Sequence, residues 1–255
     1  MYPEERQQAI ASLVMSMGRA SVTELAQRYD VTTETVRRDL AALDRAGVVR
    51  RVHGGAVPAR ALHVVEPGVM ERETTRADHK DAIARAALDY LPVGGGSVVF
   101  DAGTTTGRVA ALLPSDRELV AVTNSLPVAA RLAALPLVSL QLLGGRVRGL
   151  TQAAVGEPAL RVLDALRVDV AFIGTNAISA EHGLSTPDSD EAAVKRAMVR
   201  AANFVVVVAD SSKVGREELM SFAPIDRVDV LVTDAEIADA DRAGLTDRGV
   251  EVVVA

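Results

Sequence analysis

Five short polar segments each follow a run of valines or other apolar residues, and their groups are suited to binding a small anion. The segments cover residues 101–106, 123–125, 144–146, 174–176 and 210–213. Their glycines let the backbone approach a ligand closely, and their threonine and asparagine side chains supply hydroxyl and amide groups. Arg146 and Lys213 add positive charge. Grouped around one crevice, these residues would suit a small polyhydroxy phosphate.

A lone Gly-Thr pair after a strand is also an ordinary turn that caps the next helix, so no single segment is decisive. The pair Glu191 and Lys195 can also be interpreted in two ways. Their i,i+4 spacing fits either an exposed helical ion pair or a carboxylate that faces the crevice and binds sugar hydroxyls. From the five segments and this pair we predict one binding set. It comprises Asp101, Gly103, Thr104, Thr105, Thr106, Thr123, Asn124, Ser125, Gly145, Arg146, Gly174, Asn176, Glu191, Lys195 and Lys213.

A second group of polar residues, near the N-terminus, is suited to contacting DNA. Residues 32–38 open an expected helix, from which side chains reach base edges or phosphates, and residues 50–53 lie on an expected β-hairpin. The plainer alternative is a three-helix core with solvated arginines. The predicted DNA-binding residues are Ser21, Thr32, Thr33, Glu34, Thr35, Arg37, Arg38, Arg50, Arg51 and His53.

Three short helices and a hairpin are expected to position this second group. Apolar residues recur at helical spacing over 4–17. Residues 21–24 then form a capping box, a serine followed three residues later by a glutamate, that starts the second helix. One threonine of the pair 32–33 caps a third helix, which runs to about Ala46. Residues 48–57 form two strands around a Gly-Gly turn. These elements together predict a winged helix-turn-helix.

The rest of the chain has the pattern of an α/β domain. Residues 59–76 show no periodicity and are interpreted as a linker. From 77 to 255, valine-rich runs alternate with helical patterns, for example at about 78–91 and 189–202. This alternation is typical of a mostly parallel, Rossmann-like sheet covered by helices on both faces. The winged helix-turn-helix is thus assigned to residues 1–58. In such a sheet ligands bind at the carboxyl ends of the strands, where the five polar segments fall.

The composition argues against several other classes of protein. Hydrophobic residues make up 49% of the chain, enough for a sizeable core. There is no cysteine and the four histidines are scattered, so we expect neither disulfides nor a metal site. No GxGxxG or GxxxxGK[ST] motif is present, so we expect no dinucleotide, ATP or other cofactor. The start lacks a signal-peptide pattern and no apolar run approaches about 18 residues, so a cytoplasmic chain without a membrane segment is expected.

The net charge of −6 is unevenly distributed along the chain. Residues 1–58 carry 8 basic and 7 acidic side chains, a net of +1, whereas the remainder carries 20 against 27, a net of −7. The acidity therefore belongs to the larger domain. A basic DNA-binding face on the smaller domain is compatible with an acidic whole chain.

The N-terminal residues resemble the DeoR family of bacterial regulators. Arg6, Ile10 and Val14, followed by TVRRDL at 35–40 and RRVHGGAV at 50–57, match that family's helix-turn-helix and wing. The larger part resembles the family's sensor domain throughout, in DAGTTT, TNS, IGTNAI, GLSTPDSDEAAVKRAM and ADSSKVGR. The resemblance implies repression of a sugar-utilisation operon that is relieved when a phosphorylated sugar binds. It also implies a homo-oligomer, dimer or tetramer, because paired heads read paired half-sites of double-stranded operator DNA.

The resemblance also implies roles for individual residues. The effector's phosphate would lie on residues 103–106 with Lys213 as its charge partner, and sugar hydroxyls would meet Asn124, Asn176 and Glu191. The GLSTPDSDEAAVKRAM segment points toward fructose-operon regulators and hence toward fructose 1-phosphate. Glycerol, hexose and deoxyribose phosphates remain alternatives.

The sensor fold is similar to ribose-5-phosphate isomerase, so an isomerase-like enzyme with an accessory DNA-binding head is the main alternative. That enzyme carries a DGADE-type segment after the strand that here ends in VAFIGTNAI, and its two aspartates align with Ile173 and Asn176. Neither replacement is a general base for moving a proton next to a carbonyl. We therefore expect a sensor with no catalytic residues. A non-regulatory, architectural DNA-binding protein is a third alternative.

Overall fold

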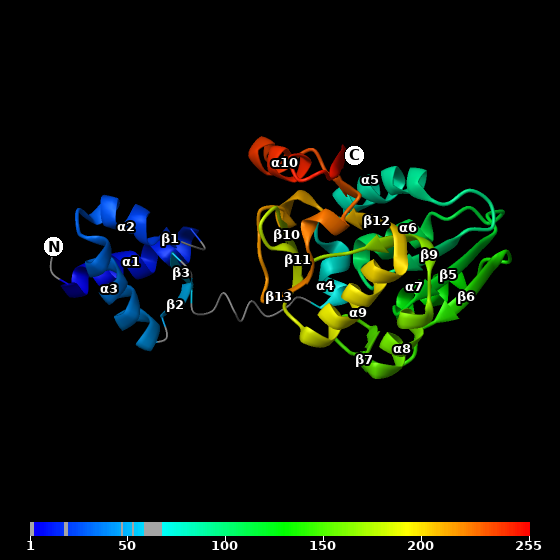
Figure 1. Cartoon of the computed structure of the whole chain (residues 1–255), viewed down its shortest axis with the longest axis horizontal. Helices are drawn as coiled ribbons and strands as arrows, with labels where there is room; N and C mark the ends of the chain where they lie inside the picture. The colour runs from blue at the N-terminus through cyan, green and yellow to red at the C-terminus, as the bar shows by residue number, and fades with distance from the viewer. Residues whose placement is uncertain (1–2, 18–19, 47, 53, 59–67) are drawn as a thin grey trace. The chain divides into compact units, whose positions relative to one another are not determined.

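The chain forms two compact units, Met1–Glu66 and Pro67–Ala255, in the computed structural model shown in Figure 1. The model describes residues 3–17, 20–46, 48–52, 54–58 and 68–255. None of the helices within these ranges is long and apolar enough to cross a membrane.

The smaller unit has the element order of a winged helix-turn-helix, with a three-stranded antiparallel sheet in the order β1-β3-β2. The capping box predicted at residues 21–24 is present: the Ser21 hydroxyl accepts from the Glu24 N–H, and the Glu24 carboxylate accepts from the Ser21 N–H. Thr32 caps the third helix. The elements are α1 (Pro3–Met17), β1 (Ala20–Ser21), α2 (Val22–Tyr29), α3 (Thr33–Arg45), β2 (Val49–Val52) and β3 (Gly55–Pro58).

The core of the smaller unit is a single apolar cluster that includes Ile10, Leu25 and Leu40. A buried ion pair crosses its edge, because Arg6 Nε of α1 lies 2.6 Å from Asp39 Oδ2 of α3. The hydrogen bond to Asp39 raises the pKa of the Arg6 guanidinium above its usual value. This pair fixes α3, the helix whose first turn is predicted to read DNA, against α1. The short strand β1 was not predicted, since two residues show no period.

The larger unit is built on a seven-stranded sheet in the order β15-β14-β12-β9-β4-β5-β6, with every neighbouring pair parallel. The sheet agrees with the parallel arrangement that the valine-rich runs predict. Its strands are β4 (Ser97–Phe100), β5 (Leu119–Thr123), β6 (Val138–Leu142), β9 (Val168–Ile173), β12 (Ala202–Val208), β14 (Val230–Thr233) and β15 (Glu251–Val254).

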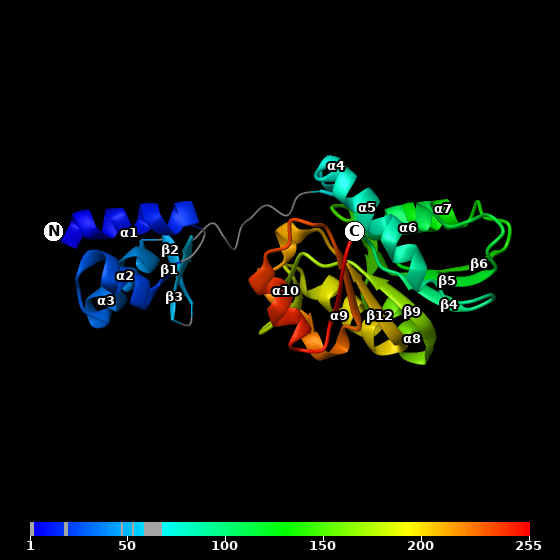
Figure 2. The same ribbon diagram turned by 90° about the horizontal axis from the view of Figure 1, so that it is seen from above.

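Helices cover both faces of the sheet, as Figure 2 shows. Successive valines of β12 alternate between two apolar clusters, because side chains of a strand point to opposite faces: Val206 packs with the cluster beneath α5 to α7, and Val207 with the cluster beneath α8 and α9. The helices are α4 (Val69–Thr74), α5 (Ala77–Ala87), α6 (Thr104–Ala111), α7 (Leu126–Leu132), α8 (Glu157–Ala165), α9 (Ser189–Ala201) and α10 (Asp239–Thr246).

Smaller elements complete the unit. A second sheet joins β10, β11 and β13, and a hairpin joins β7 and β8. Their bounds are β7 (Arg146–Arg148), β8 (Ala153–Val155), β10 (Ala177–Ser179), β11 (Gly183–Thr186) and β13 (Met220–Ala223), with the 3-10 turns η2 (Leu88–Tyr90), η3 (Ser211–Lys213) and η4 (Ile225–Arg227).

The strand order places a switch point between β4 and β9. From β4 the chain adds β5 and β6 on one side of the sheet, and from β9 it adds β12, β14 and β15 on the other. The loops that leave β4 and β9 therefore diverge to opposite faces and leave a crevice between them. In parallel α/β sheets this crevice is the usual place for a ligand.

The segment interpreted as a linker, 59–76, overlaps the larger unit over residues 67–76 and contains helix α4. Six residues are too few to produce a recognisable helical period. The helix expected at about 78–91 is divided into α5 and the turn η2. Of the predicted wing residues, Arg50 and Arg51 lie on β2, and His53 lies outside the described residues.

Candidate functional site

A pocket of about 350 Å³, open to solvent, lies at the switch point. Its walls come from the loop after β4 and the start of α6, from the loop after β9, from α9, and from the end of β12 with the turn η3. The α4 helix adds one more residue. The lining residues are Arg72, Ala102, Gly103, Thr104, Thr105, Thr106, Gly174, Thr175, Asn176, Glu191, Lys195, Val208 and Lys213.

The start of α6 is shaped to receive an anion. Gly103 is its N-cap and supplies no side-chain acceptor, so the first backbone N–H groups of the helix are left without a capping side chain. The Thr106 hydroxyl donates to the carbonyl oxygens of Asp101 and Gly103 and so holds the turn. The hydroxyls of Thr104 and Thr105 have no hydrogen-bonding partner within the described part of the chain. They remain available to a ligand at a helix end that favours negative charge.

A buried ion pair lies beneath the pocket. The Lys195 ammonium of α9 contacts Asp101 Oδ2 and donates to the Gly174 carbonyl oxygen at 2.9 Å. The Gly174 N–H in turn donates to Asp101 Oδ2 at 3.0 Å. Burial raises the pKa of Asp101 above its usual range, although the Lys195 ammonium acts in the opposite direction. These contacts tie the loops after β4 and β9 to α9, so both residues chiefly position the pocket.

Glu191 also faces inward and not into solvent. It is 5% exposed, and its Oε1 accepts from Arg148 Nη1 at 2.6 Å and from the Thr151 hydroxyl. No ion pair joins Glu191 to Lys195 among the described residues. Glu191 and Lys195 therefore do not form an exposed helical ion pair, and Glu191 lines the crevice. That Glu191 binds sugar hydroxyls stays a prediction.

Lys213 differs from Lys195 because it forms no ion pair with a carboxylate among the described residues. No hydrogen bond to its ammonium group is found in the described residues, and the side chain is half-buried at the pocket wall. Burial lowers the pKa of Lys213 to about 8, and the positive charges of Arg72, Lys80 and Lys195 add to that effect, while Asp210 opposes it. An anion in the pocket would remove the conflict between these charges.

Three predicted binding residues support the pocket from behind and do not line it. The Thr123 hydroxyl donates to the Phe100 carbonyl oxygen, and the Ser125 hydroxyl caps α7. The Asn124 side chain is buried, and both ends of its amide bond within the protein: Oδ1 accepts from the Ala102 N–H at 3.1 Å, and Nδ2 donates to the Ala154 carbonyl oxygen at 3.1 Å. These residues follow β5, one strand away from the switch point.

Gly145 and Arg146 lie still further from the pocket, after the edge strand β6. Gly145 has a φ of 140°, and a Cβ there would overlap the Val155 carbonyl oxygen, so the glycine serves the hairpin. Arg146 is exposed and pairs with Asp190 at 2.5 Å. The prediction that Arg146 faces the crevice is wrong.

Arg72 of α4 is the cation that the sequence did not reveal, because it falls in the segment interpreted as a linker. Thr175 was also missed, although it lies between two predicted residues. The Thr175 hydroxyl donates to the Ala177 carbonyl oxygen at 2.6 Å. In the sequence, only its residue type and its place between Gly174 and Asn176 could have indicated that it lines the pocket.

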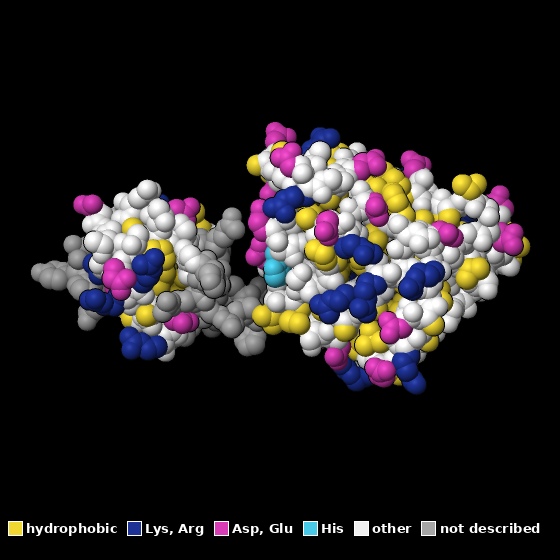
Figure 3. Space-filling view, in the orientation of Figure 1, with side chains coloured by type: hydrophobic (Ala, Val, Ile, Leu, Met, Phe, Trp, Pro, Cys, Tyr) yellow, Lys and Arg dark blue, Asp and Glu magenta, His cyan; other side chains and the backbone are white. Residues whose placement is uncertain are grey.

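The predicted DNA-binding residues lie on exposed parts of the smaller unit wherever their side chains are described. Thr32, Thr33, Glu34, Arg37 and Arg38 are exposed at the start of α3, and Thr35 is half-buried. Ser21 is used by its capping box. Figure 3 shows Lys and Arg side chains at the surface of this unit.

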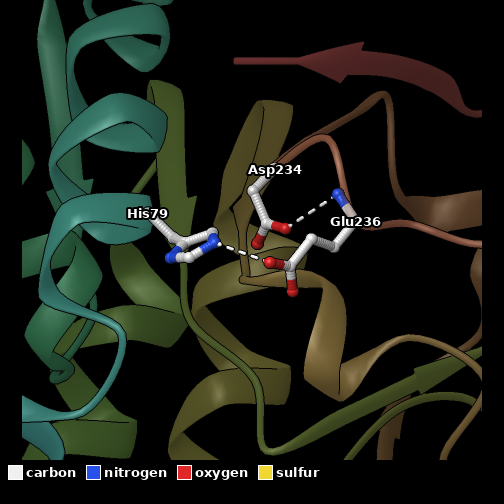
Figure 4. Close-up of side chains that lie close together, drawn as sticks. All are labelled: His79, Asp234 and Glu236. Atoms are coloured by element: carbon white, nitrogen blue, oxygen red, sulfur yellow. Dashed lines mark hydrogen bonds and ion pairs between the residues drawn. The ribbon is translucent and has the colours of Figure 1, made fainter.

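One cluster in the larger unit has the composition of a metal site, His79 with Asp234 and Glu236 (Figure 4). His79 Nε2 lies 3.2 Å from Glu236 Oε1. Arg76 already pairs with both carboxylates, at 3.1 Å from Asp234 Oδ1 and 2.8 Å from Glu236 Oε2. The hydrogen bonds from Arg76 and His79 lower the pKa of Glu236. A metal ion would have to displace the guanidinium, so we assign the cluster a structural role.

Neither of the two positions at which the sequence predicts the loss of an isomerase's aspartates carries an acid or a base. Ile173 is fully buried at the end of β9, and Asn176 lines the pocket with its Oδ1 accepting from the Thr186 hydroxyl. The one carboxylate among the described lining residues, Glu191, is paired with Arg148.

A winged helix-turn-helix joined to an α/β unit with a cationic pocket defines a ligand-responsive transcription regulator. The chain belongs to the DeoR family of such regulators. Residues 6–60 match the DeoR-like helix-turn-helix domain and residues 75–235 match the DeoR C terminal sensor domain.

The names of similar proteins agree with this assignment. The chain is 38% identical to the HTH-type transcriptional regulator GlpR of Haloferax volcanii, over 99% of this chain and 98% of that protein. It is 34% identical to the putative aga operon transcriptional repressor of Escherichia coli O157:H7, over 98% and 93%. Both are named as regulators and not as enzymes, so the chain is a regulator. Among solved structures, the ribose 5-phosphate isomerase A of Methanocaldococcus jannaschii matches with a TM-score of 0.41 and 17% identity over 55% of each chain.

Proposed function

We propose that this regulator represses a sugar-utilisation operon and that a phosphorylated sugar, bound in the pocket at the switch point, releases it from its operator. The observation that carries the proposal is the unbalanced positive charge of the pocket. Asp101 neutralises Lys195, and Arg148 neutralises Glu191. Lys213 forms no ion pair with a carboxylate in the described part of the chain, and the positive charge of Arg72 acts on it from the same pocket wall.

The start of α6 and Lys213 together suit a phosphate group. The phosphate would accept hydrogen bonds from the α6 backbone N–H groups and from the hydroxyls of Thr104 and Thr105, with Lys213 as its charge partner. The Glu191 carboxylate and the Asn176 amide, on the opposite wall, would bind sugar hydroxyls. Asn124 is no longer assigned a ligand contact, because its amide is used within the protein.

The DNA-binding role rests on α3. Its first two turns expose Arg37 and Arg38, and its position in a winged helix-turn-helix is that of the recognition helix. The chain is proposed to act as a homo-oligomer, dimer or tetramer, because two such helices read two half-sites of a double-stranded operator.

The function is tested by measuring the affinity of the full chain for DNA from the region upstream of the operon beside its gene. Fluorescence anisotropy is recorded with fructose 1-phosphate, glycerol 3-phosphate, ribose 5-phosphate and glucose 6-phosphate, and with each compound lacking its phosphate. We expect at least one phosphate ester to lower DNA affinity and its unphosphorylated partner to have no effect. Equal effects of the two forms, or no effect of any compound, would contradict the proposal.

A pair of variants separates the two halves of the function. Arg37→Ala should weaken binding to the upstream DNA at least tenfold while the sugar phosphate still raises the melting temperature of the larger unit. Arg45→Ala, an exposed change in the last turn of the same helix, is the matched control. If both variants bind DNA like the wild type, α3 is not the reading helix.

A further inference from the structure

The helix α4 buries little apolar surface of its own. It has six residues, none of them fully buried: Val69 is half-buried, and Met70 is 77% exposed. A helix this short is not stable by itself in water. Its conformation therefore depends on the groups that hold it, and α4 is the first described element after residues 59–67, which lead from the smaller unit.

Each end of α4 is attached to a neighbouring element. The Val69 N–H donates to the Leu150 carbonyl oxygen at 2.8 Å. At the other end, the Lys80 ammonium donates to the carbonyl oxygens of Arg72 and Thr75. Lys80 is buried, and burial lowers its pKa. The two carbonyl acceptors, together with the negative charges of Asp210 and Glu73, offset the cost of placing its charge there.

These contacts lead back to the walls of the pocket. Arg108, which donates to the Glu73 carbonyl oxygen at 2.7 Å, belongs to α6, whose first turn lines the pocket. Leu150 adjoins Thr151, whose hydroxyl holds the Glu191 carboxylate. Two separate contacts, through Arg108 and through Leu150, therefore connect α4 to elements of the pocket wall.

The turn that follows α4 is anchored beside Lys213. Arg76 donates to the Ser211 hydroxyl at 3.1 Å and lies 3.3 Å from Asp210 Oδ1. It adopts a left-handed conformation, with a φ of 53°, which is uncommon for arginine and persists because four acceptors hold the side chain. A shift of η3 would therefore act on Arg76, the N-cap of α5, which directly follows Thr75, the C-cap of α4.

Positive charges from two elements meet at the pocket. Arg72 enters the pocket from α4, and Lys213 enters from η3. Burial lowers the pKa of Lys213, and the charges of Arg72 and Lys80 add to that effect, while Asp210 opposes it. An anion bound between Arg72 and Lys213 would attract both side chains.

We propose that α4 is the element through which the effector acts on the rest of the chain: the effector's anionic group is bound jointly by Arg72 of α4 and Lys213 of η3, and this tightens the docking of α4. The proposal deepens the function proposed above and rests on it. Arg72 is then a binding residue for the effector, and α4 is the two-state element whose docking the effector favours.

Hydrogen–deuterium exchange of the full chain, with and without inorganic phosphate or fructose 1-phosphate, tests this directly. We expect slower exchange both around residues 103–106 and 211–213 and over residues 69–75. Arg72→Met should weaken the affinity for either compound at least tenfold and abolish the protection of residues 69–75. Arg85→Met, an exposed change on α5, is the matched control and should behave like the wild type.

The outcomes separate the two proposals. Protection confined to 103–106 and 211–213, or an Arg72→Met variant that binds and protects like Arg85→Met, overturns the role of α4 and leaves the sugar-phosphate pocket intact. No protection anywhere with either compound, in a wild type that also ignores the other sugar phosphates, overturns both. The wild-type exchange pattern decides the role of α4 even if Arg72→Met does not fold.

Discussion

Two lysines of the same pocket are expected to change stability in opposite directions when each is replaced by methionine. Lys213 is half-buried without a carboxylate partner, whereas Lys195 is buried against Asp101. Methionine removes the charge in both cases and keeps most of the apolar stem. The comparison therefore isolates what each charge contributes to the fold.

The structure fixes the sign and the size of each effect. Lowering the pKa of Lys213 from 10.5 to about 8 corresponds to about 3 kcal/mol of unfavourable free energy for the charged form in the folded state. Lys213→Met should therefore raise the free energy of unfolding at pH 7 by up to about 3 kcal/mol, while abolishing binding of the sugar phosphate. Lys195→Met should lower it by about 3 kcal/mol, because it leaves the Asp101 carboxyl group buried without its cation.

The pH dependence provides an internal check. The unfolded chain keeps the Lys213 proton up to the ordinary pKa of 10.5, and the folded chain keeps it only up to about 8. Between these values the unfolded state binds more protons, so the wild type gains stability as the pH rises. The advantage of Lys213→Met should thus be complete below pH 8 and should disappear by about pH 10.5.

Urea unfolding of the full chains, followed by far-UV circular dichroism at a series of pH values, measures these differences. The transition of the larger unit is the one to compare. The reasoning is refuted if Lys213→Met is destabilised at pH 7 as Lys195→Met is, or if its advantage does not change between pH 8 and pH 10.5.

Three further predictions follow from other contacts. Arg6→Met should lower the free energy of unfolding of the smaller unit by about 3 kcal/mol, because Asp39 loses the partner of a buried ion pair, and a loss below about 1 kcal/mol in chemical unfolding would contradict this. Gly145→Ala should destabilise the larger unit by about 2 kcal/mol, because the position has a positive φ and the new Cβ would overlap the Val155 carbonyl oxygen. The control is Gly144→Ala at the neighbouring position, which has open space around it and should change the free energy of unfolding by less than about 0.5 kcal/mol in the same assay. The affinity for a sugar phosphate should fall about tenfold per pH unit above pH 8 as Lys213 loses its proton, and calorimetric titrations that show a constant affinity up to pH 9.5 would exclude Lys213 as the charge partner.

Local chemistry made much of the fold predictable from sequence. The capping box at residues 21–24 needs only two side chains three residues apart, and the burial of β12 on both of its faces follows from an unbroken run of valines. The polar segments after strands were also readable, because five such segments recur along one chain, although each alone could be an ordinary capping turn. Such features are set by neighbours in sequence.

The order of the strands in the sheet was not readable, and it decides which polar segments form the pocket. The segments after β4 and β9 meet at the switch point, while those after β5 and β6 lie one and two strands away, at about 5 Å per strand. Because the sequence does not show the strand order, Asn124 and Arg146 were assigned to the pocket. Both residues lie outside it. Their residue types fitted the prediction, but the strand order placed them elsewhere.

Helix α4 and Arg72 escaped prediction for a different reason. The helix is held by Lys80, Arg108 and Leu150, which are distant in sequence, and it buries no apolar face. A segment without an apolar stripe has no hydrophobic period to recognise. Its place at the pocket could be seen only in three dimensions.

Isothermal titration of the full chain with one sugar in phosphorylated and unphosphorylated form tests the central claim most directly. The pair to use is the one whose phosphate ester most lowers the affinity for the upstream DNA. The account predicts heat of binding only for the phosphate ester with the wild type, and none for either form with Lys213→Met. Equal binding of the two forms, or undiminished binding of the phosphate ester by Lys213→Met, would contradict it.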